Sequence, residues 1–285
     1  MCTNFTPTRN GQWVKEHFGV DLPGADYPVE AYPGYAAPIV VKSHKTGRVA
    51  CGLARFGLIP SWAKDDKISR HTYNARSETV REKPSYRTAW KQRRYGIALL
   101  DNFYEPNYVT GKAERWKIEL ESNEPFGIAS IWDTWTDPIS GELVTSFSML
   151  TVNADEHPVM NQFHRAGDEK RKPVVLAESQ FDDWLSSTDS VAIGMMNFEY
   201  MHPLISSKEK SRYDNKRYRL RFSRVEKNRP KLDLSKIYLS SIIEAVNEDI
   251  KTTKCKLKSK KGCTGKTTKC VTHNLWDGLS RHINN

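Results

Sequence analysis

The sequence predicts a mixed α+β fold in which β-strands dominate. Two observations support this prediction: short apolar or alternating runs recur between turn signals up to residue 176, and only a few segments have helical periodicity. Strands of this number and spacing favour a curved or partly closed sheet with short helices. The chain of 285 residues, with eight Trp, twelve Tyr and ten Phe, is long enough to bury a full core in one or two domains.

Seven runs, taken in order, are expected to form strands. Turn-forming clusters such as 137–141 bound them, because glycine, proline, asparagine and aspartate interrupt regular structure. The predicted strands are 37–41, 49–56, 95–100, 116–120, 126–132, 147–152 and 174–176. Three segments are expected to form short helices: 12–18, 85–92 and 179–185.

Charge divides the chain into a nearly neutral body and a basic end. Residues 1–206 hold 23 Lys and Arg against 26 Asp and Glu, whereas residues 207–285 hold 21 against 8. We expect one domain over 1–224 and a basic C-terminal extension over 225–285, with an amphipathic helix at 235–250 followed by a disordered tail. The extension indicates a polyanion partner, most often nucleic acid, the alternative being a solvated tail without a specific partner.

The five cysteines lack the spacing of a disulfide framework, and we interpret them as thiols. Three of them lie in the extension with a histidine and could together hold zinc: Cys255, Cys263, Cys270 and His273. Because neither pair has the usual C-x2-C spacing, we expect a disordered tail there and no metal site.

No stretch approaches twenty apolar residues, and the segment after Met1 lacks the charged and apolar regions of a secretory signal. We therefore expect an intracellular protein with no membrane partner. It would be cytoplasmic and nucleoid-associated in a bacterium, or nuclear in a eukaryote.

Cys2 is the most informative residue of the chain. Its small side chain favours removal of Met1, which would leave an α-amine (pKa about 8) and a thiol (pKa about 8.5) on one residue. Such a 1,2-aminothiol condenses with an aldehyde to an imine and then closes to a five-membered thiazolidine. The alternative is a small residue at a frayed terminus.

Further candidate groups lie in internal segments. Asn74 and Arg76 could donate to an oxygen near a nucleophile and pair with a phosphate, the alternative being a turn with a surface salt bridge. Glu105 follows an apolar run among aromatic residues, so desolvation would raise its pKa and suit it to general acid catalysis, unless it only lies at a sheet edge. His164 could stabilise an alkoxide or carry a proton, or be structural. Trp62 could stack on an unpaired base if it is exposed, or pack in the core.

The order of these segments resembles the SRAP (SOS response-associated peptidase) family over residues 2–224. The resemblance rests on an initial Met-Cys, then Gly-Leu-Ile-Pro-Ser-Trp-Ala at 57–63, Asn-Ala-Arg-Ser-Glu-Thr at 74–79, Phe-Tyr-Glu at 103–105, and His164 ahead of Lys-Pro-Val-Val-Leu at 172–176. It implies a compact, β-rich α+β domain with a basic groove.

The resemblance also implies a function in DNA damage repair. Members of the family shield abasic sites in single-stranded DNA by covalent capture through the mature N-terminal cysteine. On the matching positions the nucleophile would be Cys2, surrounded by Asn74, Glu105 and His164, while Arg76 and Trp62 would hold the DNA. The product would be a thiazolidine crosslink, formed through lyase-like Schiff-base chemistry that is single-turnover or slowly reversible. The protein would act as a monomer and without a cofactor. The peptidase activity would be self-removal of Met1 or a short leader.

The chain departs from the family pattern at several positions. Thr3 and Asn4 stand where Gly-Arg is common, so the phosphate contact of that arginine is not expected; Pro106 stands where a Trp is common; and 167–170 lengthens the loop after His164. None of these changes removes a group that the chemistry needs.

Two rival functions stay open: a cysteine peptidase with an N-terminal nucleophile, and a non-covalent single-stranded DNA-binding protein that relies on the basic extension.

Overall fold

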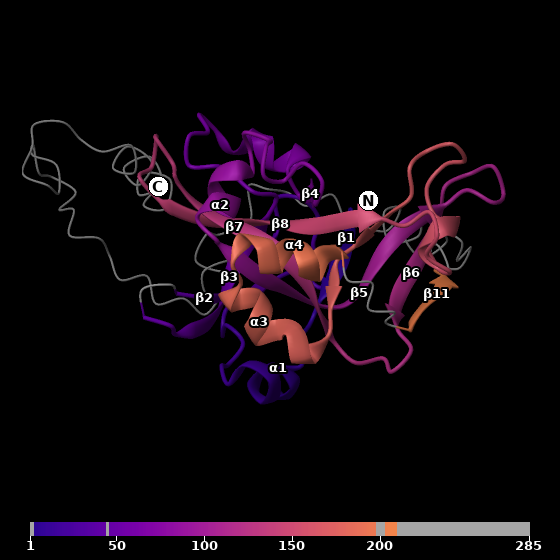
Figure 1. The fold of residues 1–285 in the computed structure, drawn as a ribbon, viewed down its shortest axis with the longest axis horizontal. Helices are drawn as coiled ribbons and strands as arrows, with labels where there is room; N and C mark the ends of the chain where they lie inside the picture. The colour runs from indigo at the N-terminus through magenta and orange to yellow at the C-terminus, as the bar shows by residue number, and fades with distance from the viewer. Residues whose placement is uncertain (1–2, 44–45, 198–202, 210–285) are drawn as a thin grey trace, which may run out of the picture. The chain divides into compact units, whose positions relative to one another are not determined.

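Within residues 3–43, 46–197 and 203–209, which the computed structural model describes, eleven strands join in one sheet (Figure 1). The strands are β1 (Asn4–Pro7), β2 (Ala36–Lys42), β3 (Val49–Phe56), β4 (Asn74–Arg76), β5 (Tyr95–Asn107), β6 (Glu114–Leu120), β7 (Phe126–Thr136), β8 (Leu143–Asn153), β9 (Arg171–Pro173), β10 (Val175–Leu176) and β11 (Leu204–Lys208).

Five of the strands close on themselves. Strand β5 pairs antiparallel with both β2 and β7, β7 pairs with β8, and β2 pairs with β3. The ring is completed by a short parallel pairing of β3 with β8. The sheet is therefore a partly closed barrel, which confirms the β-rich α+β class and the partly closed sheet expected from the sequence.

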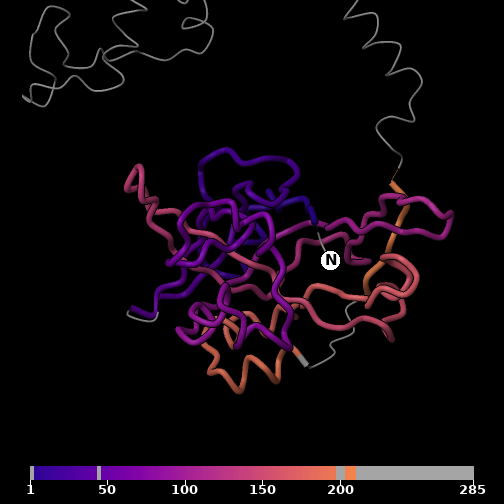
Figure 2. The backbone as a smooth tube through the Cα atoms, turned by 90° about the horizontal axis from the view of Figure 1, so that it is seen from above, coloured from indigo at the N-terminus to yellow at the C-terminus, as the bar shows by residue number. Residues whose placement is uncertain are grey.

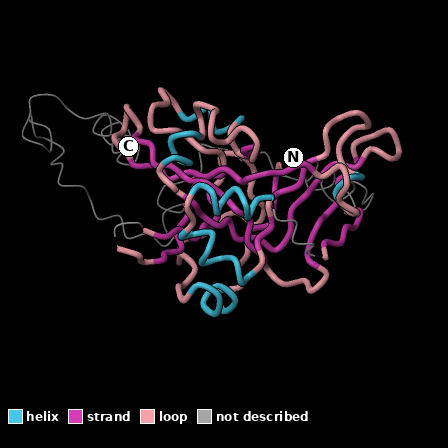
Figure 3. The backbone as a smooth tube through the Cα atoms, in the orientation of Figure 1, coloured by secondary structure: helices cyan, strands magenta, loops and turns pink. Residues whose placement is uncertain are grey.

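The helices are short and cover the outside of this barrel. They are α1 (Gly11–Phe18), α2 (Arg87–Lys91), α3 (Phe181–Ser186) and α4 (Asp189–Asn197), with three 3-10 turns at Asp66–His71, Met160–Gln162 and Glu178–Gln180. Figure 3 shows how little helix (cyan) accompanies the strands (magenta). None of the helices in the described part of the chain has the length and apolar character that a bilayer crossing requires.

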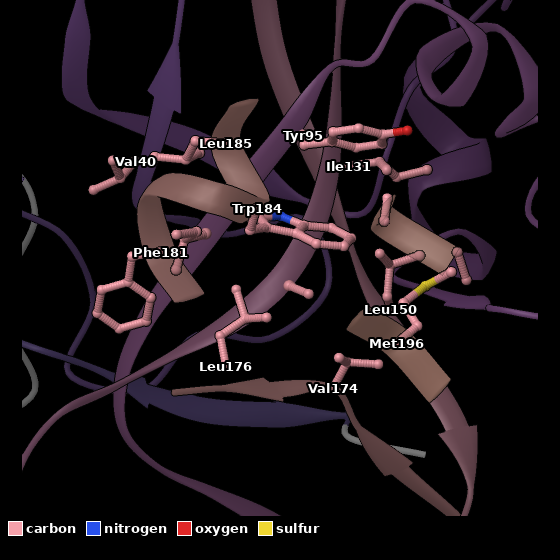
Figure 4. Close-up of a cluster of buried hydrophobic side chains, with 14 of the residues drawn as sticks. Val40, Tyr95, Ile131, Leu150, Val174, Leu176, Phe181, Trp184, Leu185 and Met196 are labelled. Atoms are coloured by element: carbon pink, nitrogen blue, oxygen red, sulfur yellow. The ribbon is translucent and has the colours of Figure 1, made fainter. Parts of the chain in front are cut away.

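Successive side chains of the strands point to opposite faces of the sheet, and this alternation produces two apolar cores. On β5, Ile97 and Leu99 face the helices, whereas Ala98 and Leu100 face the inside of the barrel with side chains from the other four ring strands. The outer core centres on Trp184 of α3, which is fully buried and donates its indole N–H to the carbonyl of Gly96 at 2.9 Å (Figure 4). Burial of each such large side chain stabilises the fold by roughly 1.5–3 kcal/mol.

All seven predicted strands are present, most of them longer than expected. Helix α2 is shorter than the predicted 85–92, because the residues before it form successive turns. Strands β1, β4, β9 and β11 and helix α4 were not predicted, being too short or too mixed in composition to carry a periodic signal. Cys2, the extension over 225–285 and its four candidate zinc ligands lie outside the described residues.

Candidate functional site

The site is built around Glu105, which is buried, and His164, which is partly buried. Glu105 lies near the end of β5 and is 1% exposed, and its Oε2 is 3.5 Å from Nε2 of His164. The expectation that this glutamate is desolvated is confirmed. The alternative of a sheet edge is wrong, because β5 pairs with β1 on one side and with β6 on the other.

Backbone contacts with the end of β5 hold His164 in place. Its N–H donates to the carbonyl of Pro106 at 2.9 Å, and the preceding Phe163 bridges to Asn107. Figure 2 shows the loop after β8 running beside the β5–β6 hairpin. His164 has a φ of 63°, in the left-handed region that residues other than glycine seldom adopt. Strain of this kind is tolerated where the surroundings over-determine a side-chain position, as at functional sites.

Burial sets the protonation states of the pair. Desolvation raises the pKa of Glu105 to about 7. Desolvation also lowers the pKa of His164 to about 4, while a hydrogen bond with the backbone of Arg171 acts in the opposite direction. At neutral pH the imidazole is therefore uncharged and the carboxyl is divided between its two forms. The contact is a polar pair that can give or take a proton, and it is not an ion pair.

Strand β1 begins beside Glu105. Asn4 is paired with Tyr104, and the next residue, Phe5, is held on its other edge by two hydrogen bonds with the backbone of Ala31, at 3.2 and 2.8 Å. The Asn4 amide donates to Glu30, and Arg115 donates to the same carboxylate. Cys2 lies outside the described residues, two positions before Asn4 in the sequence.

Strand β4 presents Asn74 and Arg76 on one face, because side chains two apart in a strand point the same way. The Arg76 guanidinium is half-exposed and lies 2.7 Å from a carboxylate oxygen of Glu169, in the loop that follows His164. Asn74 is buried, and its backbone carbonyl accepts a hydrogen bond from the hydroxyl of Tyr86 at 3.0 Å. The polar run is thus a strand that pairs with β8, and the surface salt bridge weighed as an alternative for Arg76 is present.

Arg171 is a buried cation that sequence reasoning missed. It is 2% exposed and donates to both carboxylate oxygens of Glu78 at 3.1 and 2.9 Å, to Glu169 at 2.6 Å, and to the carbonyl of Thr151 at 2.7 Å. Its hydrogen bond lowers the pKa of Glu169. Through Glu169 the network ties Arg76 to the His164 loop. A possible signal was the pair of acidic residues at 78 and 169, which need a cation if they are held together.

Trp62 is displayed on the surface, with 55% of its area exposed. The chain turns at Gly57, whose φ is 110° and where an added Cβ would come within 2.2 Å of the Ser69 carbonyl oxygen, so glycine is required there. The following Leu58 and Ile59 are buried and anchor the loop. The indole N–H donates to the carbonyl of Pro84 at 3.3 Å. The core alternative for Trp62 is wrong, and its ring is available for stacking.

The described contacts therefore join most of the predicted residues. Glu105 and His164 touch, Arg76 is linked to the same loop through Glu169, and Asn74 shares a strand with Arg76. Trp62 is connected less directly, through the segment that contains Pro84 and Tyr86. In the part of the chain that the structure describes, no three His, Cys, Asp or Glu side chains are grouped as a metal site.

Comparison with known proteins gives consistent results. A sequence model of the family described as SOS response associated peptidase (SRAP) matches residues 1–208. The abasic site processing protein YoqW of Bacillus subtilis (strain 168) is 32% identical over 195 residues, which cover 65% of this chain and 80% of that protein. The abasic site processing protein HMCES of Xenopus tropicalis is 31% identical over 142 residues, covering 43% of this chain and 40% of that protein.

Solved structures share the fold. An X-ray structure of a protein from Bordetella bronchiseptica superposes with a TM-score of 0.67 and 28% identity, over 73% of this chain and 100% of that one. A second, from Bacteroides thetaiotaomicron, superposes with a TM-score of 0.61 at 19% identity and shows likeness of fold alone.

Proposed function

Because the chain belongs to the SOS response-associated peptidase (SRAP) family, we propose that it processes abasic sites in single-stranded DNA by covalent capture through Cys2. One observation carries this proposal: a buried carboxyl with a pKa of about 7 touches a neutral imidazole, at the point where the N-terminal strand begins two residues after Cys2. The names of the relatives, which are abasic site processing proteins, support the same substrate.

Capture starts with opening of the sugar. An abasic deoxyribose is mostly a closed hemiacetal, and a proton given to its ring oxygen releases the C1′ aldehyde. Glu105 in its protonated form is the donor, and His164 stabilises the same oxygen. A carboxyl with a pKa of about 7 carries this proton in about half of the molecules at neutral pH, whereas an exposed glutamate is almost fully ionised there.

The C1′ hydroxyl gives up its proton as the ring opens, and this proton restores the acid form of Glu105. The amine of Cys2 then attacks C1′, and Glu105 protonates the departing hydroxyl, which leaves as water. The resulting imine would invite β-elimination and strand breakage. Addition of the Cys2 sulfur to C1′ converts the imine to a thiazolidine and removes the electron sink. The net reaction forms one C–N and one C–S bond, releases one water and leaves the strand intact.

Arg76 and Trp62 would hold the DNA. The half-exposed guanidinium suits a bidentate contact with a phosphate, although it must exchange its partner Glu169 for that phosphate. The exposed indole suits stacking on an unpaired base. Asn74, on the same face of β4 as Arg76, would donate its amide to a sugar or phosphate oxygen near the lesion.

The test is incubation of the purified protein with a single-stranded oligonucleotide that carries one abasic site, followed by denaturing electrophoresis. We expect a shifted band that survives heating in detergent, and no such band with Cys2→Ala or with the undamaged oligonucleotide. A band of equal strength from Cys2→Ala would show that the Cys2 thiol does not form the stable linkage. No band from the wild-type protein with Met1 removed would refute capture.

A further inference from the structure

A pocket of about 670 Å³ lies between α2 and the start of α4, apart from the Glu105–His164 site. We call it the α2–α4 pocket. Its lining residues are Arg81, Arg87, Thr88, Trp90, Lys91, Gln92, Arg93 and Asp189. Figure 1 shows the two helices that border it, and the Trp90 indole N–H joins them by donating to Asp189.

Positive charge dominates this pocket. Four of the lining side chains are cations and one is a carboxylate, and all five are exposed. Asp189 is engaged by Trp90 and lies 4.0 Å from Arg81. In the described part of the chain, neither Arg87 nor Lys91 forms an ion pair. Four cations against one carboxylate on a concave surface create a local positive potential that attracts an anion.

The chemistry of the lining favours phosphate. Arginine binds phosphate oxygens in a bidentate manner, and lysine binds them as a point charge. The hydroxyl of Thr88 and the amide of Gln92 add neutral donors to the same wall. The openness of the site to solvent, with every cation exposed, suits a chain of phosphates better than one enclosed small molecule.

One chain segment connects the residues proposed to hold DNA with the α2–α4 pocket. A series of backbone turns runs from Arg76 to α2: the N–H of Thr79 donates to the carbonyl of Arg76, that of Lys83 to Thr79, and that of Arg87 to Lys83, at 3.1, 3.0 and 2.9 Å. Within this segment the carbonyl of Pro84 accepts the indole N–H of Trp62. Trp62 is therefore hydrogen-bonded to the segment that carries the cations.

We propose that the α2–α4 pocket binds backbone phosphates of the DNA strand that flanks the lesion. This inference rests on the proposed function, because it extends the contact surface of the same substrate. It assigns to Arg87 and Lys91 a role in affinity and none in the covalent chemistry.

The experiment measures reversible binding in a Cys2→Ala background, so that capture does not interfere. Undamaged single strands are used: a short one, and longer ones extended on the 5′ or the 3′ side. Arg87→Gln and Lys91→Gln are compared with the matched control Arg48→Gln, an exposed arginine in the turn between β2 and β3. Thermal melting checks that each variant is folded.

We expect Arg87→Gln and Lys91→Gln to weaken binding of the strand extended on one side, and to make the slope of log K against log salt shallower by about 0.7 for each lost contact. The two pocket variants should bind the short strand as the wild-type protein does. Arg48→Gln should bind every strand as the wild-type protein does. Wild-type affinity and slope in both pocket variants would overturn the proposal. Loss of inorganic phosphate binding in these variants without loss of DNA binding would overturn it too, because the pocket would then serve a small anion.

A separate assay of covalent capture tests the proposed function independently of the pocket. The covalent assay with intact Cys2 and saturating abasic DNA should give a full yield in Arg87→Gln. A wild-type protein that fails to capture abasic DNA refutes the capture chemistry, whereas the measurements on undamaged strands still decide whether the pocket binds DNA.

Discussion

The imidazole Nε2 of His164 lies 3.5 Å from Oε2 of Glu105, in surroundings that bury the carboxyl completely and the imidazole in large part. One residue comes from a strand and the other from a loop held to that strand by the carbonyl of Pro106. Burial acts on the two groups in opposite directions, raising the pKa of the acid and lowering that of the base. The consequence is a proton donor and a neutral acceptor side by side near pH 7.

Glu105→Gln should slow capture of an abasic strand by about 10²-fold or more, because the proton donor for ring opening and water loss is removed. The wild-type rate should fall as pH rises above about 7, the pKa of this carboxyl, and the variant should lack that alkaline decline. Single-turnover rates between pH 5 and pH 9, read from denaturing gels, check both points. An unchanged alkaline decline in the variant would show that another group titrates there.

The same substitution should change how stability depends on pH. The folded pKa of Glu105, about 7, lies above its ordinary value of 4.5, so its contribution to stability is full below pH 4.5 and is lost as pH rises through 7. Relative to Glu105→Gln, the wild-type protein should therefore lose on the order of 3 kcal/mol between pH 5 and pH 9. Urea unfolding at the two pH values measures this difference. Parallel behaviour of the two proteins would mean that the carboxyl is not desolvated.

Arg171→Met should lower the free energy of unfolding by about 1–3 kcal/mol, because it leaves the buried carbonyl of Thr151 without its donor. The carboxylates of Glu78 and Glu169 also lose their cation, but both are partly exposed and can take up water instead. Arg76→Met, which removes the half-exposed partner of Glu169, is the matched control and should cost less than about 1 kcal/mol. Chemical denaturation distinguishes the two. Equally small losses of unfolding free energy in the two variants would show that the Arg171 network does not stabilise the loop after His164.

Trp62→Ala should weaken binding of undamaged single-stranded DNA by about 1–3 kcal/mol, the value of one base stacked on an aromatic ring. Because the side chain is 55% exposed, the unfolding free energy should change by no more than about 0.5 kcal/mol. Trp62→Phe keeps a stacking surface and should recover much of the affinity. Fluorescence anisotropy measures all three proteins, and an alanine variant that binds like the wild type would exclude stacking at this position.

Much of the fold could be predicted from the sequence, because the ring strands carry long apolar runs with alternating burial. A partly closed sheet was expected, but the pairing that closes it could not be predicted, since it is a short parallel contact of β3 with β8 and a contact between distant segments leaves no local pattern. At the site, the apolar run before Glu105 correctly indicated desolvation. Arg171 was missed because arginine is seldom buried, and only the folded structure shows which carboxylates surround it. The exposure of Trp62 was also undecided, because an aromatic residue after a buried run fits either a core or a surface.

Cys2→Ser tests the central claim most directly, because it keeps the N-terminal amine and removes only the thiol. We predict that the wild-type protein and an abasic strand give an adduct whose intact mass lacks Met1 and one water, with the strand unbroken. The serine variant should instead form an imine that borohydride traps, and without borohydride it should cut the strand by β-elimination. A stable, uncut adduct of the serine variant in the absence of reductant would contradict closure by the thiol, and with it the account of how this chain protects an abasic site.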